Sequence, residues 1–288
     1  MLDQFYTRND VAKECIQNLI DCKECDNFND FDIILEPSVG TGSFYKNLDI
    51  TDPENRKMGL DLEPKVDSSK YKGIIKKMNY FNFIPDNSKR YLVIGNPPFG
   101  RVSSTAVQFF NKSAEFADVI AFIIPRTFKR VSIQNKLNLN FHLVYNRDLP
   151  LKPCCFKPKM SAKCCFQIWI KRNVKRVVIK YKNTHPDFKF LKLGPKDSKN
   201  QPTPPQNADF VIKAYGSNCG NILIGNSILK DLRPKSWHWI KIKENSSVDI
   251  PTLIKRLKSL DYSVSRDTVR QDSIGQGELV HLYKCKFQ

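Results

Sequence analysis

Four consecutive residues, Asn96, Pro97, Pro98 and Phe99, are the part of this sequence whose types most directly suggest chemistry. They follow the apolar run Tyr91–Ile94. Two prolines fix φ and remove two backbone donors, so a stiff shelf with outward-facing carbonyl groups is expected. The Asn96 side-chain oxygen and the Pro97 carbonyl would offer a planar amino group two acceptors, beside the stacking surface of Phe99. Taken alone, the tetrapeptide is equally compatible with a plain turn between a strand and a helix.

A glycine-containing turn, Leu35-Glu-Pro-Ser-Val-Gly-Thr-Gly42, follows a second apolar run. Gly40 and Gly42 would let the backbone approach a ligand closely, in conformations that other residues resist. This pattern by itself is weak, and is compatible with a dinucleotide or with no ligand. Glu36 is unfavourable beside a pyrophosphate, so the turn favours a ligand that carries positive charge.

A third segment, Gly59-Leu-Asp61, comes about twenty residues after the glycine turn, a spacing typical of nucleotide-binding folds. An acidic side chain at the end of a second strand can accept hydrogen bonds from both hydroxyl groups of a ribose. A surface aspartate at a strand end is the alternative. The spacing from the glycine turn favours the ribose interpretation.

The elements that must position these residues alternate between strand and helix. Helices are expected at residues 11–22, with Asn9 or Asp10 as the N-cap, and at 108–116. Short apolar runs predict strands at residues 32–35, 57–60, 91–94, 119–124, 141–145 and 165–170. This alternation predicts an α/β fold with a doubly wound, Rossmann-like sheet that binds its ligands at the carboxyl ends of the strands.

The composition changes after about residue 172. A basic stretch from Lys171 to Lys182 precedes a segment rich in proline and lysine at residues 195–207, which is expected to be a mobile loop. Strands are predicted at residues 210–214, 222–224 and 237–242, and a helix capped by Asp249 at 251–260. The chain is therefore expected to divide into residues 1–182 and a small α+β unit of residues 183–288.

The 288-residue chain carries a formal net charge of +18, which favours a polyanionic partner. The longest apolar run, Val119–Ile124, is too short to cross a bilayer, and charged residues interrupt the first turns of the chain, so a soluble intracellular protein without a secretory signal is expected. Among nine cysteines, Cys22-Lys-Glu-Cys25 has the spacing of half a zinc site, but no second such pair occurs. Reduced thiols without a metal are therefore expected.

Together these motifs resemble those of the adenine-N6 DNA methyltransferases. Asp3-Gln-Phe-Tyr-Thr7 is similar to the N-terminal cofactor motif of that family, and its place ahead of the glycine turn matches the gamma-class order. Residues 96–130 resemble a subset of these methyltransferases that is found in bacteria, phages and large DNA viruses. The resemblance covers roughly residues 2–171. It implies a methyltransferase-type sheet with a C-terminal target-recognition unit.

The resemblance also implies roles for individual residues around the cofactor S-adenosylmethionine. One position departs from the family, because Asn79-Tyr80-Phe81 stands where an aspartate before an aromatic usually meets the cofactor's adenine ring. Weaker or altered cofactor binding is expected there. The implied cofactor contacts are Phe5, Tyr6, Thr7, Glu36, Ser38, Gly40, Gly42, Asp61, Asn79 and Tyr80.

The implied reaction is methyl transfer to the N6 amino group of an adenine flipped out of double-stranded DNA, with Asn96, Pro97, Pro98 and Phe99 as the catalytic residues. Lys171, Arg172, Lys175 and Arg176 are expected to bind nucleic acid, although a solvated edge strand would also explain them. RNA adenine, cytosine-N4 and a catalytically silent nucleic-acid-binding subunit remain open alternatives. The cytoplasm is the expected compartment in a bacterial or viral setting, and the nucleus in a eukaryote.

Overall fold

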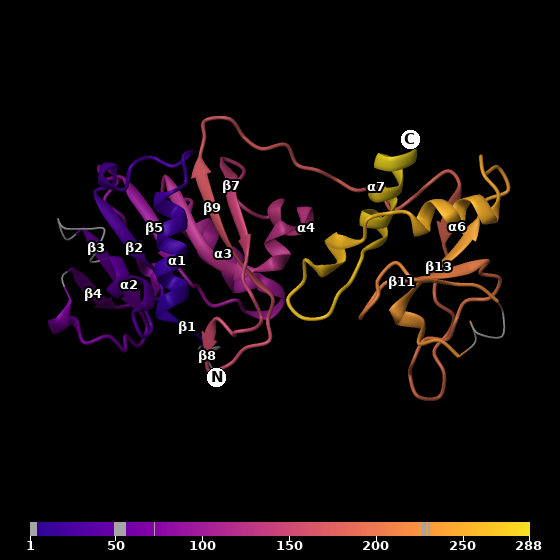
Figure 1. Cartoon of the computed structure of the whole chain (residues 1–288), viewed down its shortest axis with the longest axis horizontal. Coiled ribbons are helices and arrows are strands. Elements are labelled where there is room, and N and C mark those ends of the chain that lie inside the picture. Colours follow the sequence, from indigo (N-terminus) through magenta and orange to yellow (C-terminus); the bar gives the residue numbers. More distant parts are fainter. Residues whose placement is uncertain (1–4, 49–55, 72, 226–228, 230) are drawn as a thin grey trace. The chain divides into compact units, whose positions relative to one another are not determined.

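A computed structural model describes residues 5–48, 56–71, 73–225, 229 and 231–288. The chain divides into two compact units, residues 1–178 and 179–288 (Figure 1). This division lies four residues before the boundary expected after residue 182. The functions assigned to the two parts stay predictions.

The N-terminal unit is built on a seven-stranded sheet in the order β4-β3-β2-β5-β6-β9-β7. The first five of these strands are parallel, and β9 runs antiparallel to both of its neighbours. The predicted α/β fold with a Rossmann-like sheet is confirmed. The strands are β2 (Ile33–Glu36), β3 (Lys57–Asp61), β4 (Ile74–Lys77), β5 (Tyr91–Gly95), β6 (Val119–Pro125), β7 (Phe141–Asp148) and β9 (Cys164–Lys171).

The order of the strands reverses between β2 and β5, which are neighbours in the sheet although β3 and β4 lie between them in the sequence. Ligands of open α/β sheets bind at such a switch point, beyond the carboxyl ends of the strands. The register aligns Leu35 with Val93, so the ends of β2 and β5 lie side by side. Glu36 is also paired with Gly59 of β3. The three segments that suggested chemistry therefore leave the sheet at one edge.

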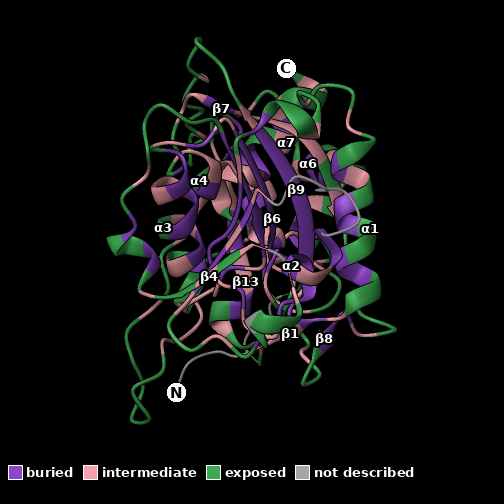
Figure 2. Cartoon of the chain, turned by 90° about the vertical axis from the view of Figure 1, so that its left-hand side faces the viewer, coloured by how far each residue is buried: buried purple, intermediate pink, exposed green. Residues whose placement is uncertain are grey.

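Helices cover both faces of this sheet. Figure 2 shows the buried strands β6 and β9 between α1 on one side and α3 and α4 on the other. Every residue of β5 and β6 is buried, as expected for strands of a sheet covered on both faces. The helices of this unit are α1 (Asn9–Ile20), α2 (Ser43–Asn47), α3 (Ser104–Ser113) and α4 (Val131–Gln134).

The predicted N-cap of the first helix was wrong. Arg8 is the N-cap of α1 and makes no capping side-chain bond. Its backbone N–H donates to the Cys155 carbonyl at 2.9 Å, and its guanidinium pairs with Asp10. Arg8 is held by the neighbouring pairing of β1 (Tyr6–Thr7) with β8 (Phe156–Lys157), a long-range contact that a local capping pattern does not show.

The C-terminal unit combines a four-stranded antiparallel sheet, in the order β10-β13-β11-β12, with helices, two of which lie wholly within the described residues. The strands are β10 (Phe188–Phe190), β11 (Phe210–Lys213), β12 (Ile222–Leu223) and β13 (Trp237–Ile242). The helices are α6 (Ile250–Lys258) and α7 (Gln276–Phe287). As predicted, Asp249 caps α6, accepting a hydrogen bond from the Thr252 N–H at 2.9 Å. Phe210, Leu253 and Tyr283 belong to one buried core that joins the sheet to both helices.

Short 3-10 helices connect several elements in both units. They are η1 (Phe28–Asp30), η3 (Ser68–Lys70), η4 (Tyr80–Asn82), η5 (Arg101–Ser103), η6 (Arg126–Lys129), η7 (Pro234–Ser236) and η8 (Ser263–Arg266). Within the described ranges, the helices all fall short of the length and apolarity that a membrane span requires.

Candidate active site

The glycine turn needs its glycines for two separate physical reasons. Gly40 and Gly42 both have positive φ, 48° and 79°. A side chain on Gly40 would lie 2.9 Å from the Tyr6 ring, and one on Gly42 would lie 2.5 Å from Val66. The Gly42 N–H donates to the Val39 carbonyl at 2.7 Å, which closes the turn just before α2. The turn is therefore tight, and the N-terminal segment packs directly on it.

Glu36 is a buried carboxyl group at the end of β2, with 3% of its surface exposed. Its Oε2 accepts a hydrogen bond from the Tyr45 N–H at 2.8 Å. Burial raises the pKa of Glu36 well above its ordinary value; the Tyr45 N–H opposes this shift, and the charge of Asp61 adds to it. A cation placed beside Glu36 would offset this cost and favour the charged carboxylate.

Asp61, the last residue of β3, is tied to the glycine turn. Its Oδ2 accepts from the Gly40 N–H at 2.8 Å, and its Oδ1 accepts from the Glu63 N–H at 2.8 Å. Each carboxylate oxygen has a second lone pair, so these bonds leave Asp61 able to accept from a further donor. It thus holds the turn in place, a positioning role that the sequence did not reveal.

Residues Asn96 to Phe99 form a corner directly after β5, called the Asn96 corner below. One hydrogen-bond acceptor in this corner has no donor. The Asn96 carbonyl accepts from Ser38 Oγ at 3.1 Å, and its side-chain Nδ2 donates to the Phe5 carbonyl at 3.1 Å. Its Oδ1 is buried and has no hydrogen-bond partner among the described residues. A buried, unpaired acceptor costs about 1–3 kcal/mol. Pro97 is buried beside it, while Pro98 and Phe99 are partly exposed.

Residues 5–7 connect the corner with the glycine turn. The Phe5 carbonyl contacts Asn96, and the Tyr6 ring lies against Gly40. The Tyr6 hydroxyl accepts from Lys65 Nζ at 2.7 Å, and Ser43 Oγ donates to the Thr7 carbonyl. The structure therefore brings the N-terminal segment together with the three other motifs. Asp3 and Gln4 lie outside the described residues.

Two predicted residues, Asn79 and Tyr80, are used differently from the expectation. Asn79 is exposed, and its Oδ1 accepts from the Phe81 N–H at 3.1 Å, which caps η4. Tyr80 is only 2% exposed: its hydroxyl is 2.7 Å from Ser113 Oγ, and its ring stacks on Phe109. The expected Tyr80 contact with a ligand is thus replaced by a core contact, because its hydroxyl finds a partner inside the protein.

Phe81 is the aromatic residue of this segment that faces outward, with 39% of its surface exposed. It packs edge-on against Phe109, at 5.1 Å between ring centroids. No role was expected for Phe81 from the sequence. The sequence Asn79-Tyr80-Phe81 alone does not indicate which of its two aromatic rings is buried.

The basic stretch after β9 is neither a strand nor uniformly available to a ligand. β9 ends at Lys171 and residues 172–182 form no strand, so the alternative of a solvated edge strand was wrong. Arg172 pairs with Glu24 at 2.9 Å. Arg176 donates from Nε to the Phe141 carbonyl at 2.6 Å, and its guanidinium lies 5.3 Å from the centre of the Trp169 ring. Arg176 therefore fastens the chain to the sheet, whereas the exposed Lys175 has no such contact in the described part.

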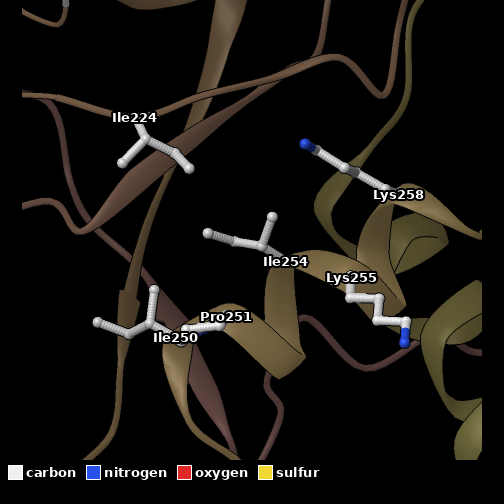
Figure 3. A pocket seen from close by; sticks show the side chains of 6 residues that line it. All are labelled: Ile224, Ile250, Pro251, Ile254, Lys255 and Lys258. Atoms are coloured by element: carbon white, nitrogen blue, oxygen red, sulfur yellow. The ribbon is translucent and has the colours of Figure 1, made fainter.

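A hollow in the C-terminal unit is lined by none of the predicted site residues. It has a volume of about 610 Å³. Figure 3 shows that Ile224 follows the β11–β12 hairpin and that the other lining side chains come from α6. The lining residues are Ile224, Ile250, Pro251, Ile254, Lys255 and Lys258. Apart from the two lysines these described residues are apolar, and no acid or histidine is among them.

Comparisons with known proteins give similarity of structure alone. No protein family and no curated protein matches the sequence. A Pyrococcus horikoshii protein whose assignment as an RNA methyltransferase is provisional matches 59% of this chain and 88% of its own, at 16% identity and a TM-score of 0.45. The plantazolicin methyltransferase BpumL in complex with SAH matches 57% and 84%, at 10% identity and a TM-score of 0.40.

A third similar structure is the methyltransferase subunit of a type I restriction-modification system from Streptococcus thermophilus. It matches 70% of this chain at 13% identity, with a TM-score of 0.40, and the chain spans half of its length. Similarities at this level do not establish an activity.

Proposed function

We propose that this protein is a methyltransferase that uses S-adenosylmethionine to methylate the N6 amino group of an adenine flipped out of double-stranded DNA. The unpaired Asn96 Oδ1 at the end of β5 is the observation that carries the proposal. An amino group entering this corner would supply the missing donor. The choice of adenine as the target base, and of DNA as the substrate, depends on the resemblance of the motifs to the adenine-N6 DNA methyltransferases.

The residues at the switch point fit S-adenosylmethionine. The buried Glu36 suits a cationic group, and the ligand carries an ammonium and a sulfonium. Asp61 has acceptor capacity left for ribose hydroxyls. Gly40 and Gly42 keep side chains away from the space above the turn, and Tyr6 flanks it. When bound, the cofactor would supply an electrophilic methyl group.

The catalytic contribution of the chain is mainly positioning. An exocyclic amine is a poor nucleophile because its lone pair is conjugated with the ring. Asn96 Oδ1 and the Pro97 carbonyl would accept hydrogen bonds from its two N–H groups, which favours a pyramidal nitrogen whose lone pair is free to react. Once methylated, the nitrogen would release one of these protons to solvent. Such preorganised acceptors contribute through orientation and electrostatics, and no strong base is required.

The substrate cannot reach this corner from within a base stack. Asn96 Oδ1 is shielded from solvent, and the Phe5 carbonyl lies beside its amide. Entry of an amine therefore requires both a base outside the duplex and a shift of the segment next to Asn96. The net charge of +18 would attract the DNA and offset part of the flipping cost of a few kcal/mol.

Label transfer tests the proposal. The protein is incubated with methyl-labelled S-adenosylmethionine and with plasmid DNA, RNA or a protein extract, and modified nucleosides are separated. We expect N6-methyladenine in DNA, and a 100- to 1,000-fold lower rate for Asn96→Ala. The matched control is Asn87→Ala, an exposed residue that precedes β5 at the opposite end of the strand. Label only in RNA or protein, or an unchanged rate for Asn96→Ala, would refute the proposal.

A further inference from the structure

The turn after Phe99 holds two consecutive non-glycine residues in the left-handed conformation. Val102 has φ 52° and ψ 38°, and Ser103 has φ 62° and ψ 17°. This conformation is unfavourable for residues with a Cβ, and for a β-branched residue such as valine it is a real outlier. Strained residues of this kind persist only where the surrounding structure enforces them.

The contacts on both sides of Val102 enforce its conformation. Ser103 is 1% exposed, and its Oγ lies 2.8 Å from Thr127 Oγ1 in η6. On the other side, the Phe99 carbonyl accepts from the Ala106 N–H at 3.2 Å, which ties the corner to α3. The turn is thus fixed to two neighbouring elements, and Val102 lies between the two fixed points.

Burial of the Val102 side chain does not compensate for this backbone strain. It is 73% exposed, so little apolar surface is removed from water. The adjacent Arg101 is exposed too, and its guanidinium forms no ion pair within the described part of the chain. An apolar side chain held rigidly in solvent beside a cation is suited to the interior of a base stack flanked by phosphates.

We propose that Val102 is a wedge that enters the DNA duplex at the position vacated by the target base, while Arg101 contacts the adjoining phosphate. This proposal depends on the proposed function. Val102 is three residues after Phe99, and three residues span at most about 11 Å. This distance is no greater than the width of the major groove, roughly 12 Å. Val102 can therefore fill the stack while the flipped adenine occupies the corner, which stabilises the open state of the duplex.

The test compares one DNA in two forms: circular single-stranded phage DNA and its double-stranded form. In the single strand no base pair has to be opened. We expect Val102→Ala to lower the initial methylation rate on the duplex about 10-fold or more and to change the single-strand rate less than about 2-fold. Val102→Ile should retain the duplex rate. Ile84→Ala is the matched control, since Ile84 is also a β-branched residue in solvent, 88% exposed, and lies outside the basic stretch, and it should change neither rate.

Permanganate oxidation of unstacked thymines measures opening of the duplex without methyl transfer. Wild-type protein and Asn96→Ala should both create reactive thymines in the duplex, and Val102→Ala should create fewer. Thymine reactivity without methylation by the wild-type protein would refute the methyl transfer of the proposed function but not the opening of DNA, which is the part that the wedge depends on. An equal loss of rate on both DNA forms, full thymine reactivity with Val102→Ala, or activity on RNA alone would overturn the wedge.

Discussion

Glu36→Gln should strengthen the fold and weaken the binding of S-adenosylmethionine at the same time. The amide can still accept the Tyr45 N–H, which lies 2.8 Å from Oε2 in the wild type. What it lacks is the charge that would meet the ammonium of the ligand. A hydrogen bond to a charged group contributes about 1.5–3 kcal/mol, so the Kd should rise about 10- to 100-fold.

The stability change has the opposite sign because burial raises the pKa of Glu36 in the folded protein. The folded state then binds a proton more tightly than the unfolded state, so this group stabilises the fold below its unfolded pKa, near 4.5, and loses that contribution as the pH rises through the folded pKa. A neutral glutamine removes the loss. The free energy of unfolding above neutral pH should therefore be higher in Glu36→Gln than in the wild type.

Calorimetric titration with S-adenosylhomocysteine, which keeps the ammonium, and urea unfolding measure the two effects. Affinity of the wild type should fall as the pH drops below the raised pKa of Glu36, by up to about tenfold per unit, and this dependence should vanish in Glu36→Gln. The matched control is Glu63→Gln, an exposed acid two residues after Asp61. Unchanged affinity or a less stable variant would contradict the role assigned to Glu36.

Three further predictions concern residues whose structural and functional roles separate. Asn96→Ala should change the free energy of unfolding in urea by less than about 1 kcal/mol, because removing the unpaired Oδ1 offsets the lost bond to Phe5, and a loss above about 3 kcal/mol would contradict this. Tyr80→Phe should lower stability by about 1 kcal/mol without changing the Kd of the cofactor, because the ring is buried and only a core hydrogen bond is lost. Phe81→Ala should raise that Kd, because Phe81 is the exposed aromatic ring of the segment that the resemblance places at the cofactor's adenine; equal Kd values in both variants would exclude Phe81 from the site. Arg176→Ala should cost about 1–3 kcal/mol of stability, while Lys175→Ala should leave stability unchanged and reduce the salt dependence of DNA binding by about one charge; a destabilised Lys175→Ala would count against this division.

The sequence predicted the central sheet well because its strands are continuous apolar runs bounded by polar or glycine residues. Val119–Pro125 is buried throughout and was recognised within one residue. The edge strand Ile74–Lys77 was missed, since only one face of an edge strand needs apolar residues and none of its residues is fully buried. The helix Gln276–Phe287 was missed as well, because its apolar residues are not confined to one stripe: besides the buried Leu279, Val280 and Tyr283 it carries the partly buried Leu282 and Phe287.

Parts of the candidate site could be predicted where a single physical property of the residue type explains its position. Gly40 and Gly42 were expected to need unusual dihedral angles, and both have positive φ. Tyr80 and Arg176 could not be assigned from sequence, because a buried hydroxyl partner and a carbonyl from a distant strand decide their roles. The strain at Val102 carries no sequence signal, since it is imposed by contacts with another turn.

The pairing of β1 with β8 has a consequence for the synthesis of the protein. Thr7 pairs with Phe156 and Tyr6 with Lys157, so the segment next to the glycine turn stays without its strand partner until Lys157 has left the ribosome. The parallel strands of the sheet precede that point in the chain. A nascent chain can therefore complete those strands before the segment that flanks Gly40 is anchored, and the site is assembled only near the end of translation of the N-terminal unit.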